Sequence, residues 1–232
     1  MTQAACPAGN TKLALFDLDH TLIPFDSDHA WGEFTTGIGW TDAEVFKQRN
    51  DAFYADYRAG RLDIAAYVRH ATEAMRKKGP EAAYDAQMQF MQEQVLPRIT
   101  PKAQALLRGH REAGEQLILI TATNEFVTRP IAHALGIGEL IAVDLAVDAQ
   151  GWITGEIAGV PSYREGKVTR MTQWLAGRQL GWADVECTFY SDSINDLQLL
   201  EKVQHPVATN PDAALRAIAL ARGWRILELF KT

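Results

Sequence analysis

The sequence predicts an α/β protein whose core is a doubly wound, mostly parallel β-sheet, with an inserted all-helical domain and a small β-hairpin. Three observations support this prediction. Short apolar runs alternate with helical patterns, as they do in βαβ units around a buried parallel sheet. The long stretch at residues 26–96 contains no strand pattern. Farther along the chain, two short strand-like runs flank a turn that contains a glycine.

Four apolar runs are the predicted strands of the sheet, and each has the length of a short buried strand. They cover residues 13–16, 116–120, 187–190 and 205–209. Helical patterns fill the gaps between them, at residues 102–113, 126–135, 167–175 and 194–201. The first of these helices follows Thr100-Pro101, a favourable pair of residues for a helix N-terminus.

The segment between the first two predicted strands is too long for a simple crossover connection. Gly60 and Gly79-Pro80 indicate breaks between successive helices within it. We therefore expect a helical cap domain at residues 26–96, a core domain at 12–25 plus 97–232, and a flexible N-terminal tail at 1–11. The strand-like runs at residues 143–147 and 152–156 predict the hairpin.

The composition is that of an ordinary globular protein, because 47% of the 232 residues are hydrophobic, 22% are charged and the net charge is −6. The basic run Arg76-Lys77-Lys78 suits a helix C-terminus better than a nucleic-acid surface. Cys6 and Cys187 are too few for a disulfide framework. The chain shows neither a membrane-spanning run nor a secretory signal. We expect a cytoplasmic protein without nucleic-acid or membrane partners.

Polar clusters follow three of the predicted strands. Asp17 and Asp19 end the first, residues 121–124 the second, and Asp192 and Asp196 the third. Ligands of open parallel sheets bind beyond these strand ends, so the clusters are expected to converge. Carboxylates held close together repel unless a cation lies between them, and oxygen-only ligands suit Mg²⁺. The alternative for any single aspartate is a helix or turn cap.

The motif Asp17-Leu18-Asp19-His20-Thr21 resembles the DxDxT signature of the haloacid-dehalogenase-like superfamily, in its phosphatase branch. Three further signatures of that superfamily follow in the same order. They are a Thr or Ser after an apolar strand (Thr121), a Lys that opens a helix (Lys167), and a loop of the form [G/S]DxxxD (Ser191-Asp192 to Asp196). The resemblance covers residues 12–209, and the helical insert resembles the cap of phosphoserine-phosphatase-like members. It implies a Rossmann-like core.

The resemblance implies a set of chemical roles. Asp17 would be the nucleophile that forms an aspartyl-phosphate, and Asp19 the general acid and base. Thr121 and Lys167 would hold the phosphoryl oxygens. The predicted Mg²⁺ site consists of four aspartates: Asp17, Asp19, Asp192 and Asp196. Asp19 would contribute its backbone carbonyl. Asp196 would orient either Lys167 or a water bound to the metal.

Five residues are predicted to bind the substrate: Asp26, Arg69, Thr123, Asn124 and Asn195. In phosphoserine phosphatases, a Glu at the position of Asp26 contacts the substrate amine, and an Arg in a stretch similar to that around Arg69 binds its carboxylate. Asp26 as a helix cap and Arg69 as a solvated residue are the alternatives. The chain departs from those enzymes at Ala122-Thr123, where they have two glycines. The expected substrate is phosphoserine-like or a phosphorylated amino alcohol such as histidinol phosphate.

Other classes of protein remain open at this point. A dehalogenase is disfavoured because such members lack the second aspartate, which is Asp19 here. A phosphotransferase or phosphomutase would use the same phospho-aspartate with an alcohol as acceptor. A catalytically silent phosphate-binding protein would be expected to lack one of the motif residues, and none is missing. The expected partner is a small phosphate ester, and the expected oligomeric state is a monomer or homodimer.

Overall fold

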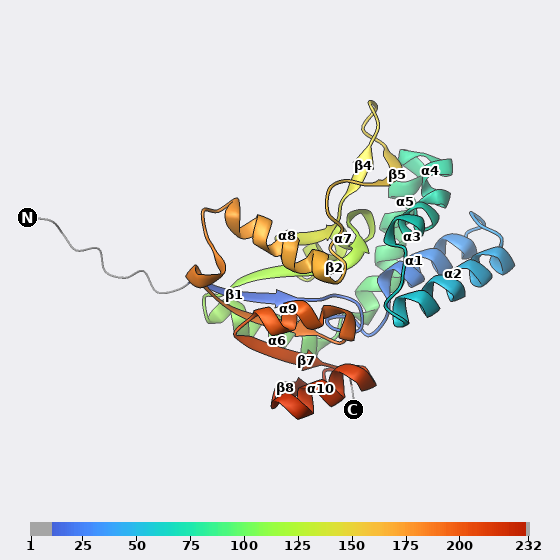
Figure 1. The fold of residues 1–232 in the computed structure, drawn as a ribbon. Coiled ribbons are helices and arrows are strands. Elements are labelled where there is room, and N and C mark those ends of the chain that lie inside the picture. The colour runs from blue at the N-terminus through green and yellow to red at the C-terminus, as the bar shows by residue number, and fades with distance from the viewer. Residues whose placement is uncertain (1–10, 231–232) are drawn as a thin grey trace, which may run out of the picture.

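A computed structural model describes residues 11–230 of the chain, apart from the side chain of Arg58, and it has the predicted α/β architecture (Figure 1). Six strands form one sheet in the order β3-β2-β1-β6-β7-β8, and all neighbouring pairs are parallel. Their bounds are β1 Thr11–Phe16, β2 Gln116–Asn124, β3 Glu139–Val143, β6 Val185–Ser191, β7 His205–Thr209 and β8 Arg225–Leu227. The predicted tail at residues 1–11 lies, apart from Thr11, outside the described residues.

Helices cover both faces of this sheet because successive strand residues point to opposite sides. Ala14 and Phe16 of β1 pack with α6 (Pro101–Glu112) and α7 (Glu125–Ala134). Leu13 and Leu15 belong to the second core cluster, which contains apolar residues of α8 (Glu165–Ala176), α9 (Leu197–Lys202) and α10 (Ala213–Arg222). The sheet is therefore doubly wound, as predicted, and Thr100 caps α6 through its hydroxyl.

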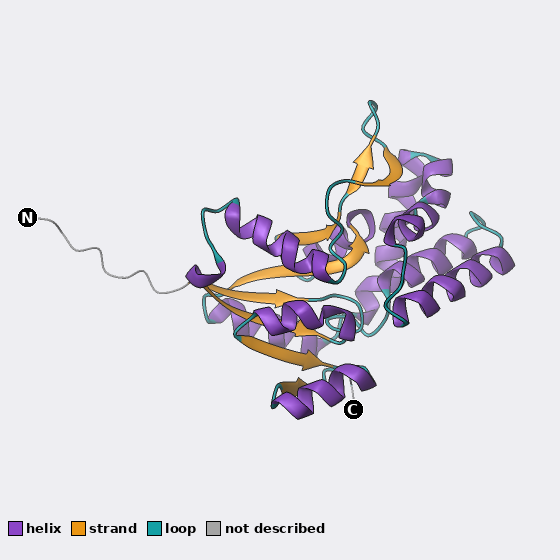
Figure 2. Ribbon diagram, in the orientation of Figure 1, coloured by secondary structure: helices purple, strands orange, loops and turns teal. Residues whose placement is uncertain are grey.

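Helices alone connect β1 to α6 in the structure (Figure 2). The helices are α1 Ser27–Gly37, α2 Ala43–Arg58, α3 Ile64–Ala71, α4 Glu73–Lys78 and α5 Pro80–Phe90, followed by a π-helical turn at Met91–Val95 and a 3₁₀ turn at Leu96–Arg98. Aspartates cap three of them: Asp26 accepts backbone N–H groups of α1, Asp42 of α2 and Asp63 of α3. None of the helices within residues 11–230 is long and apolar enough to cross a membrane.

The hairpin differs in detail from the prediction. It consists of β4 (Leu145–Val147) and β5 (Ile153–Ile157), whereas Val143 belongs to β3 of the main sheet and pairs with Asn124. The apolar alternation continues across Asp144, so the sequence pattern alone does not show where the chain leaves the sheet. The strands β3 and β8 were not predicted; β8 has only three residues, too few for a pattern. Strand β5 packs against α3 and α4 of the helical insert.

Close packing at the start of α8 generates a prediction about Gly166. A Cβ atom on this residue would lie 1.9 Å from the carbonyl oxygen of Pro161, which is backbone and not free to move away. Gly166→Ala is therefore expected to destabilise the protein by about 2 kcal/mol or more, measured by urea unfolding. The matched control is Gly109→Ala in α6, where nothing lies within 4 Å and a gain of about 0.5–1 kcal/mol is expected. Equal stability of the two variants would contradict the packing described here.

Candidate active site

The loop after β1 carries the first two predicted catalytic residues. Its apolar residues Leu18, Leu22 and Ile23 are fully buried, and the Leu18 carbonyl accepts backbone N–H groups from both Leu22 (2.8 Å) and Ile23 (3.2 Å). His20 has a left-handed backbone conformation (φ 55°), which turns the chain sharply. These features fix the course of the loop that carries Asp19 beyond the carboxyl end of β1.

Lys167 lies between two aspartates in the interior of the protein. Its Nζ is 2.8 Å from Oδ1 of Asp17 and 2.7 Å from Oδ2 of Asp196, and the lysine is only 2% exposed. The Ser191 hydroxyl donates to the same oxygen of Asp196, at 2.7 Å. Burial lowers the pKa of Lys167, but Asp17 and Asp196 outweigh it and raise that pKa overall, so the ammonium stays charged.

Thr21 connects the first loop to the loop after β6. Its hydroxyl lies 3.2 Å from Oδ2 of Asp17 and 3.3 Å from Oδ1 of Asp192, and it accepts the backbone N–H of Asp192 at 3.0 Å. One hydroxyl has one proton to donate, so it serves one of the two carboxylates at a time. Burial first, and then the charges of Asp17 and Asp196, raise the pKa of Asp192 well above its ordinary value.

This arrangement suits a hard divalent cation. Asp17 and Asp192 converge on one hydroxyl, and their negative charge is partly uncompensated, because Lys167 is shared with Asp196. Within residues 11–230, no three His, Cys, Asp or Glu side chains are placed to hold a metal together. Mg²⁺ commonly takes only one or two carboxylates and completes its shell with waters and substrate. The two carboxylates of Asp17 and Asp192 therefore fit such an ion, while the carboxylate of Asp196 is engaged by Lys167.

The carboxylate of Asp19 is held by one hydrogen bond on each oxygen. The backbone N–H of Ser27, at the start of α1, donates to Oδ1 (2.7 Å), and the Thr123 hydroxyl donates to Oδ2 (2.9 Å). Burial raises the pKa of Asp19 well above its ordinary value, and the charges of Asp26 and Asp17 raise it further. A carboxyl group with a raised pKa gives up and takes back a proton more readily near the pH of the reaction than an ordinary aspartate, which suits general acid and base catalysis.

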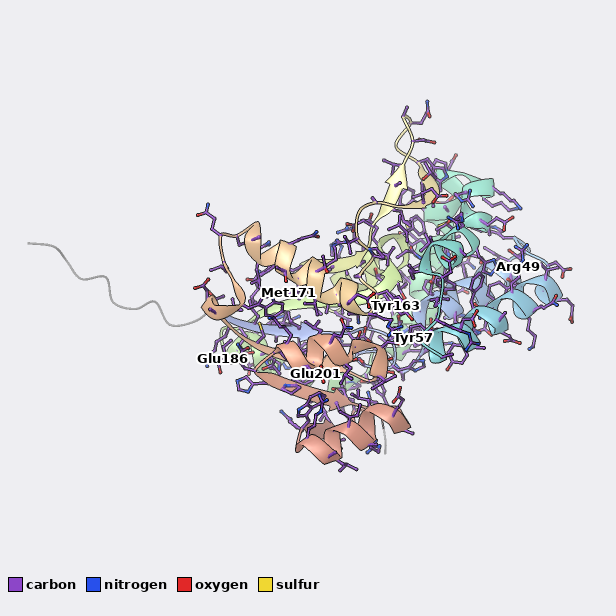
Figure 3. All side chains as sticks on the ribbon, viewed as in Figure 1. Arg49, Tyr57, Tyr163, Met171, Glu186 and Glu201 are labelled. Carbon is purple, nitrogen blue, oxygen red and sulfur yellow. The ribbon has the colours of Figure 1, made fainter. Side chains whose placement is uncertain are left out.

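A cavity of about 130 Å³ lies between the strand ends and the helical insert. Five carboxylates line it: Asp17, Asp19, Asp26, Asp28 and Asp192. Aromatic side chains form much of the remaining wall: Phe53, Tyr54, Tyr57, Tyr67 and Tyr163. None of the described residues that line it is an arginine or a lysine. Figure 3 shows Tyr57 and Tyr163 side by side where the helices meet the core, and their ring centroids are 5.9 Å apart.

Asp28 is the most secluded of these carboxylates, at 7% exposure. Asn124 Nδ2 donates to its Oδ1 at 3.3 Å, and the hydroxyl of Tyr67 is hydrogen-bonded to the same carboxylate. Burial and the neighbouring charge of Asp26 raise the pKa of Asp28 to about 7. Burial first, and then the charge of Asp28, raise the pKa of Tyr67 well above its ordinary value, so the tyrosine acts as a neutral donor.

The predicted residues fall into two groups. Thr121, Thr123 and Asp26 line the cavity, and the Thr121 hydroxyl accepts the backbone N–H of Thr123. The structure does not bring Asn195 and Arg69 to the described cavity wall. Asn195 donates through Nδ2 to the backbone carbonyl of Tyr57 and so connects the core to α2. Arg69 is half exposed and pairs with Glu156 of the hairpin at 3.2 Å. Asn124, which donates to Asp28, also caps α7.

Four residues of the site were not predicted as site residues: Thr21, Asp28, Tyr57 and Tyr67. Thr21 is the last letter of the DxDxT motif, so the motif itself was a signal that it would face the aspartates. Asp28 stood out only as one of several acidic residues near Asp26. The two tyrosines come from α2 and α3, and nothing in an amphipathic helix pattern distinguishes a residue that faces a cavity from one that faces a core.

Comparison with known proteins identifies the family. A model described as haloacid dehalogenase-like hydrolase matches residues 14–201. A histidinol-phosphatase of Neisseria meningitidis serogroup C (strain 8013) is 42% identical over 93% of this chain and 98% of its own length. Phosphoserine phosphatase SerB1 of Mycobacterium tuberculosis (strain H37Rv) is 33% identical over 95% of this chain and 71% of its own. The chain therefore belongs to the haloacid dehalogenase-like hydrolases, and it is a phosphatase of that family.

Solved structures support the same fold. A protein of unknown function from Bordetella pertussis Tohama I superposes with a TM-score of 0.89 at 44% identity, over 95% of this chain and 100% of its own. A substrate-bound phosphoserine phosphatase superposes with a TM-score of 0.64 at 16% identity, over 97% of this chain and 95% of its own. At that identity the second likeness concerns the fold alone.

The buried Asp28 predicts how stability depends on pH. Its folded-state pKa of about 7 lies above the value of about 3.9 in an unfolded chain, so the folded state holds the proton more tightly between these values. Folding stability therefore falls as pH rises through this window, and the loss that Asp28 causes is at most about 4 kcal/mol. Asp28→Asn is expected to unfold at a higher urea concentration than the wild type at about pH 8, with a smaller difference at about pH 5. A constant difference between the two pH values would contradict the assignment.

Proposed function

We propose that this phosphatase hydrolyses the phosphate ester of a small amino alcohol in a Mg²⁺-dependent reaction, through an aspartyl-phosphate on Asp17. Histidinol phosphate is the first candidate substrate. The observation that carries the proposal is the cavity over Asp17, whose described wall contains five carboxylates and neither arginine nor lysine. Such a wall favours a ligand that is anionic at its phosphate and cationic along its carbon chain.

The residues around Asp17 support a covalent phosphoryl transfer. An oxygen of Asp17 attacks phosphorus, and the bond from phosphorus to the ester oxygen breaks as Asp19 gives its proton to the departing alkoxide. Water then attacks the phospho-aspartate, loses a proton to Asp19 and releases inorganic phosphate. Lys167 uses two N–H groups for Asp17 and Asp196, and its third N–H suits a phosphoryl oxygen.

A bound Mg²⁺ would be held by Asp17, Asp192 and the backbone carbonyl of Asp19, and it would supply positive charge against the phosphoryl oxygens. The Thr21 hydroxyl contacts the carboxylates of both Asp17 and Asp192 and so keeps them on one side of the site. The Thr121 side chain lines the cavity and is oriented by its bond to the N–H of Thr123. Its hydroxyl proton is therefore free to face a phosphoryl oxygen.

The electrostatics of the cavity favour an amino alcohol over an amino acid. Phosphoserine carries a carboxylate, which would face Asp26 and Asp28 without a cation among the described residues of the wall. Arg69, predicted to bind such a carboxylate, pairs with Glu156 outside the cavity. An amino alcohol keeps the amine and lacks the carboxylate. The name of the Neisseria relative, which this chain matches over nearly its whole length, points to such a substrate.

The covalent mechanism is tested with Asp17→Asn. The amide is a poor nucleophile, so hydrolysis of p-nitrophenyl phosphate in Mg²⁺ is expected to fall by at least about 1000-fold. Removal of Mg²⁺ with EDTA is expected to abolish the wild-type rate, and added Mg²⁺ to restore it. Asp51→Asn, the same chemical change on the exposed surface of α2, is the control and should keep the wild-type rate. Substantial activity in Asp17→Asn would refute the mechanism.

A substrate panel tests the choice of an amino alcohol. The wild-type kcat/KM for histidinol phosphate is expected to exceed that for phosphoserine by at least about 10-fold, because burying a carboxylate beside like charges costs more than about 1.4 kcal/mol. Released phosphate is measured for both esters under the same conditions. A preference for phosphoserine would refute the proposed substrate class and leave the phosphatase mechanism standing.

A further inference from the structure

The carboxylates of the catalytic cavity extend from the nucleophile toward a second, adjoining cavity. Asp17, Asp19 and Asp26 line the catalytic cavity alone, whereas Asp28 lines both cavities. Asp28 therefore lies on the side of the catalytic cavity that adjoins the second one, and a ligand held over Asp17 can extend toward it.

The carboxyl group of Asp28 is buried, and none of its hydrogen-bond partners among the described residues is a cation. Its two polar partners, Asn124 and Tyr67, are neutral donors. An adjoining cavity of about 320 Å³ shares Asp28, Asn50 and Tyr67 as part of its wall. Two hydrogen bonds from neutral groups offset only part of the cost of burying a carboxylate.

The arginine and the lysine that line that adjoining cavity are engaged elsewhere. Arg49 pairs with Glu73 at 3.3 Å, and Lys77 pairs with the same carboxylate at 2.6 Å. Figure 3 shows Arg49 on the outer side of the helical insert, away from Tyr57 and Tyr163. A ligand in the catalytic cavity can therefore supply a further N–H donor to the carboxylate of Asp28.

We propose that Asp28, with Tyr67 and Asn124 as its supports, is a specificity-determining residue that accepts an N–H from a nitrogen-containing ring, such as an imidazole, at the far end of the substrate. This inference rests on the proposed function and adds a second recognition point to it. Asp26 receives the amine, and Asp28 receives the ring. Both residues act on the same substrate and at different distances from the phosphate.

The placement of these carboxylates matches one kind of ester. In the phosphate ester of a 2-amino alcohol with a ring on its third carbon, the phosphoryl group, the ester oxygen, the amine and the ring follow one another. Asp17 and Asp19 lie at the end of strand β1 where the phosphate is expected, and Asp28 lies where the catalytic cavity adjoins the second one. The aromatic side chains of Phe53, Tyr54 and Tyr67 line the same cavity and offer apolar surface to a flat ring.

An imidazole suits this position chemically. It titrates near neutral pH and keeps an N–H donor in both its protonated and its neutral form. A hydrogen bond to the Asp28 carboxylate is therefore available in either state, and the protonated ring also supplies the missing positive charge. Hydrogen bonds between ionised partners are about twice as strong as neutral ones.

The test compares two substrates that differ only in the ring: histidinol phosphate and 2-aminopropyl phosphate. The ring preference is defined as the ratio of their kcat/KM values. Asp28→Asn is expected to lower this ratio by about 10- to 100-fold, the usual effect of one charged hydrogen bond. Tyr67→Phe is expected to lower it less, in the same direction. Asp26→Asn should lower both kcat/KM values and leave the ratio within about 3-fold of the wild type.

A second measurement tests the inference through binding, so it does not depend on how fast the two phosphate esters are hydrolysed. Free histidinol and 2-amino-1-propanol are used as competitive inhibitors of p-nitrophenyl phosphate hydrolysis. The wild type is expected to bind histidinol more tightly, and Asp28→Asn is expected to lose most of that difference, while Asp51→Asn keeps it. An unchanged ratio and unchanged inhibition constants in Asp28→Asn would overturn the inference, as would an equal loss on both substrates. A wild-type protein without phosphatase activity, or an Asp17→Asn variant that keeps this activity, would instead overturn the proposed function.

Discussion

The buried contact of Lys167 with Asp17 and Asp196 is the interaction on which the rest of the site depends. An ammonium group at 2% exposure is stable only because two carboxylates face it at hydrogen-bond distance. This contact connects the end of β1, the start of α8 and the loop after β6. Removing Lys167 would leave two buried carboxylates facing each other without a cation, so the lysine holds the three elements together.

Carboxylates outnumber cations in this site, and their crowding has a chemical use. Burial and mutual repulsion raise the pKa of Asp19, Asp28 and Asp192. A raised pKa lets Asp19 carry a proton, and repulsion between Asp17 and Asp192 favours a divalent cation. The buried carboxyl of Asp28, whose partners are neutral donors, favours a ligand that brings an N–H group. Stability is sacrificed at the same positions, as is common where an active site is preorganised for charge that arrives with the substrate.

Much of the fold and of the catalytic centre could be predicted because strand direction determines position. Asp17 and Asp192 follow buried parallel strands and Thr121 lies in the last part of another, and the carboxyl ends of these strands meet at one edge of the sheet. The strands that were not predicted have little pattern: β3 lies at the sheet edge, and β8 has only three residues. The roles assigned to individual site residues remain proposals, now supported by contacts.

The sequence by itself determined the α/β class, the helical insert and the order of the phosphatase motifs, because periodicity and strand-end chemistry are local properties of the chain. Only the tertiary structure decided which cap residues face the cavity. Arg69 and Tyr67 lie two residues apart on α3, yet one pairs with the hairpin and the other with Asp28. A turn of helix presents neighbouring side chains to different surroundings, and the packing of the helices, the hairpin and the core selects among them.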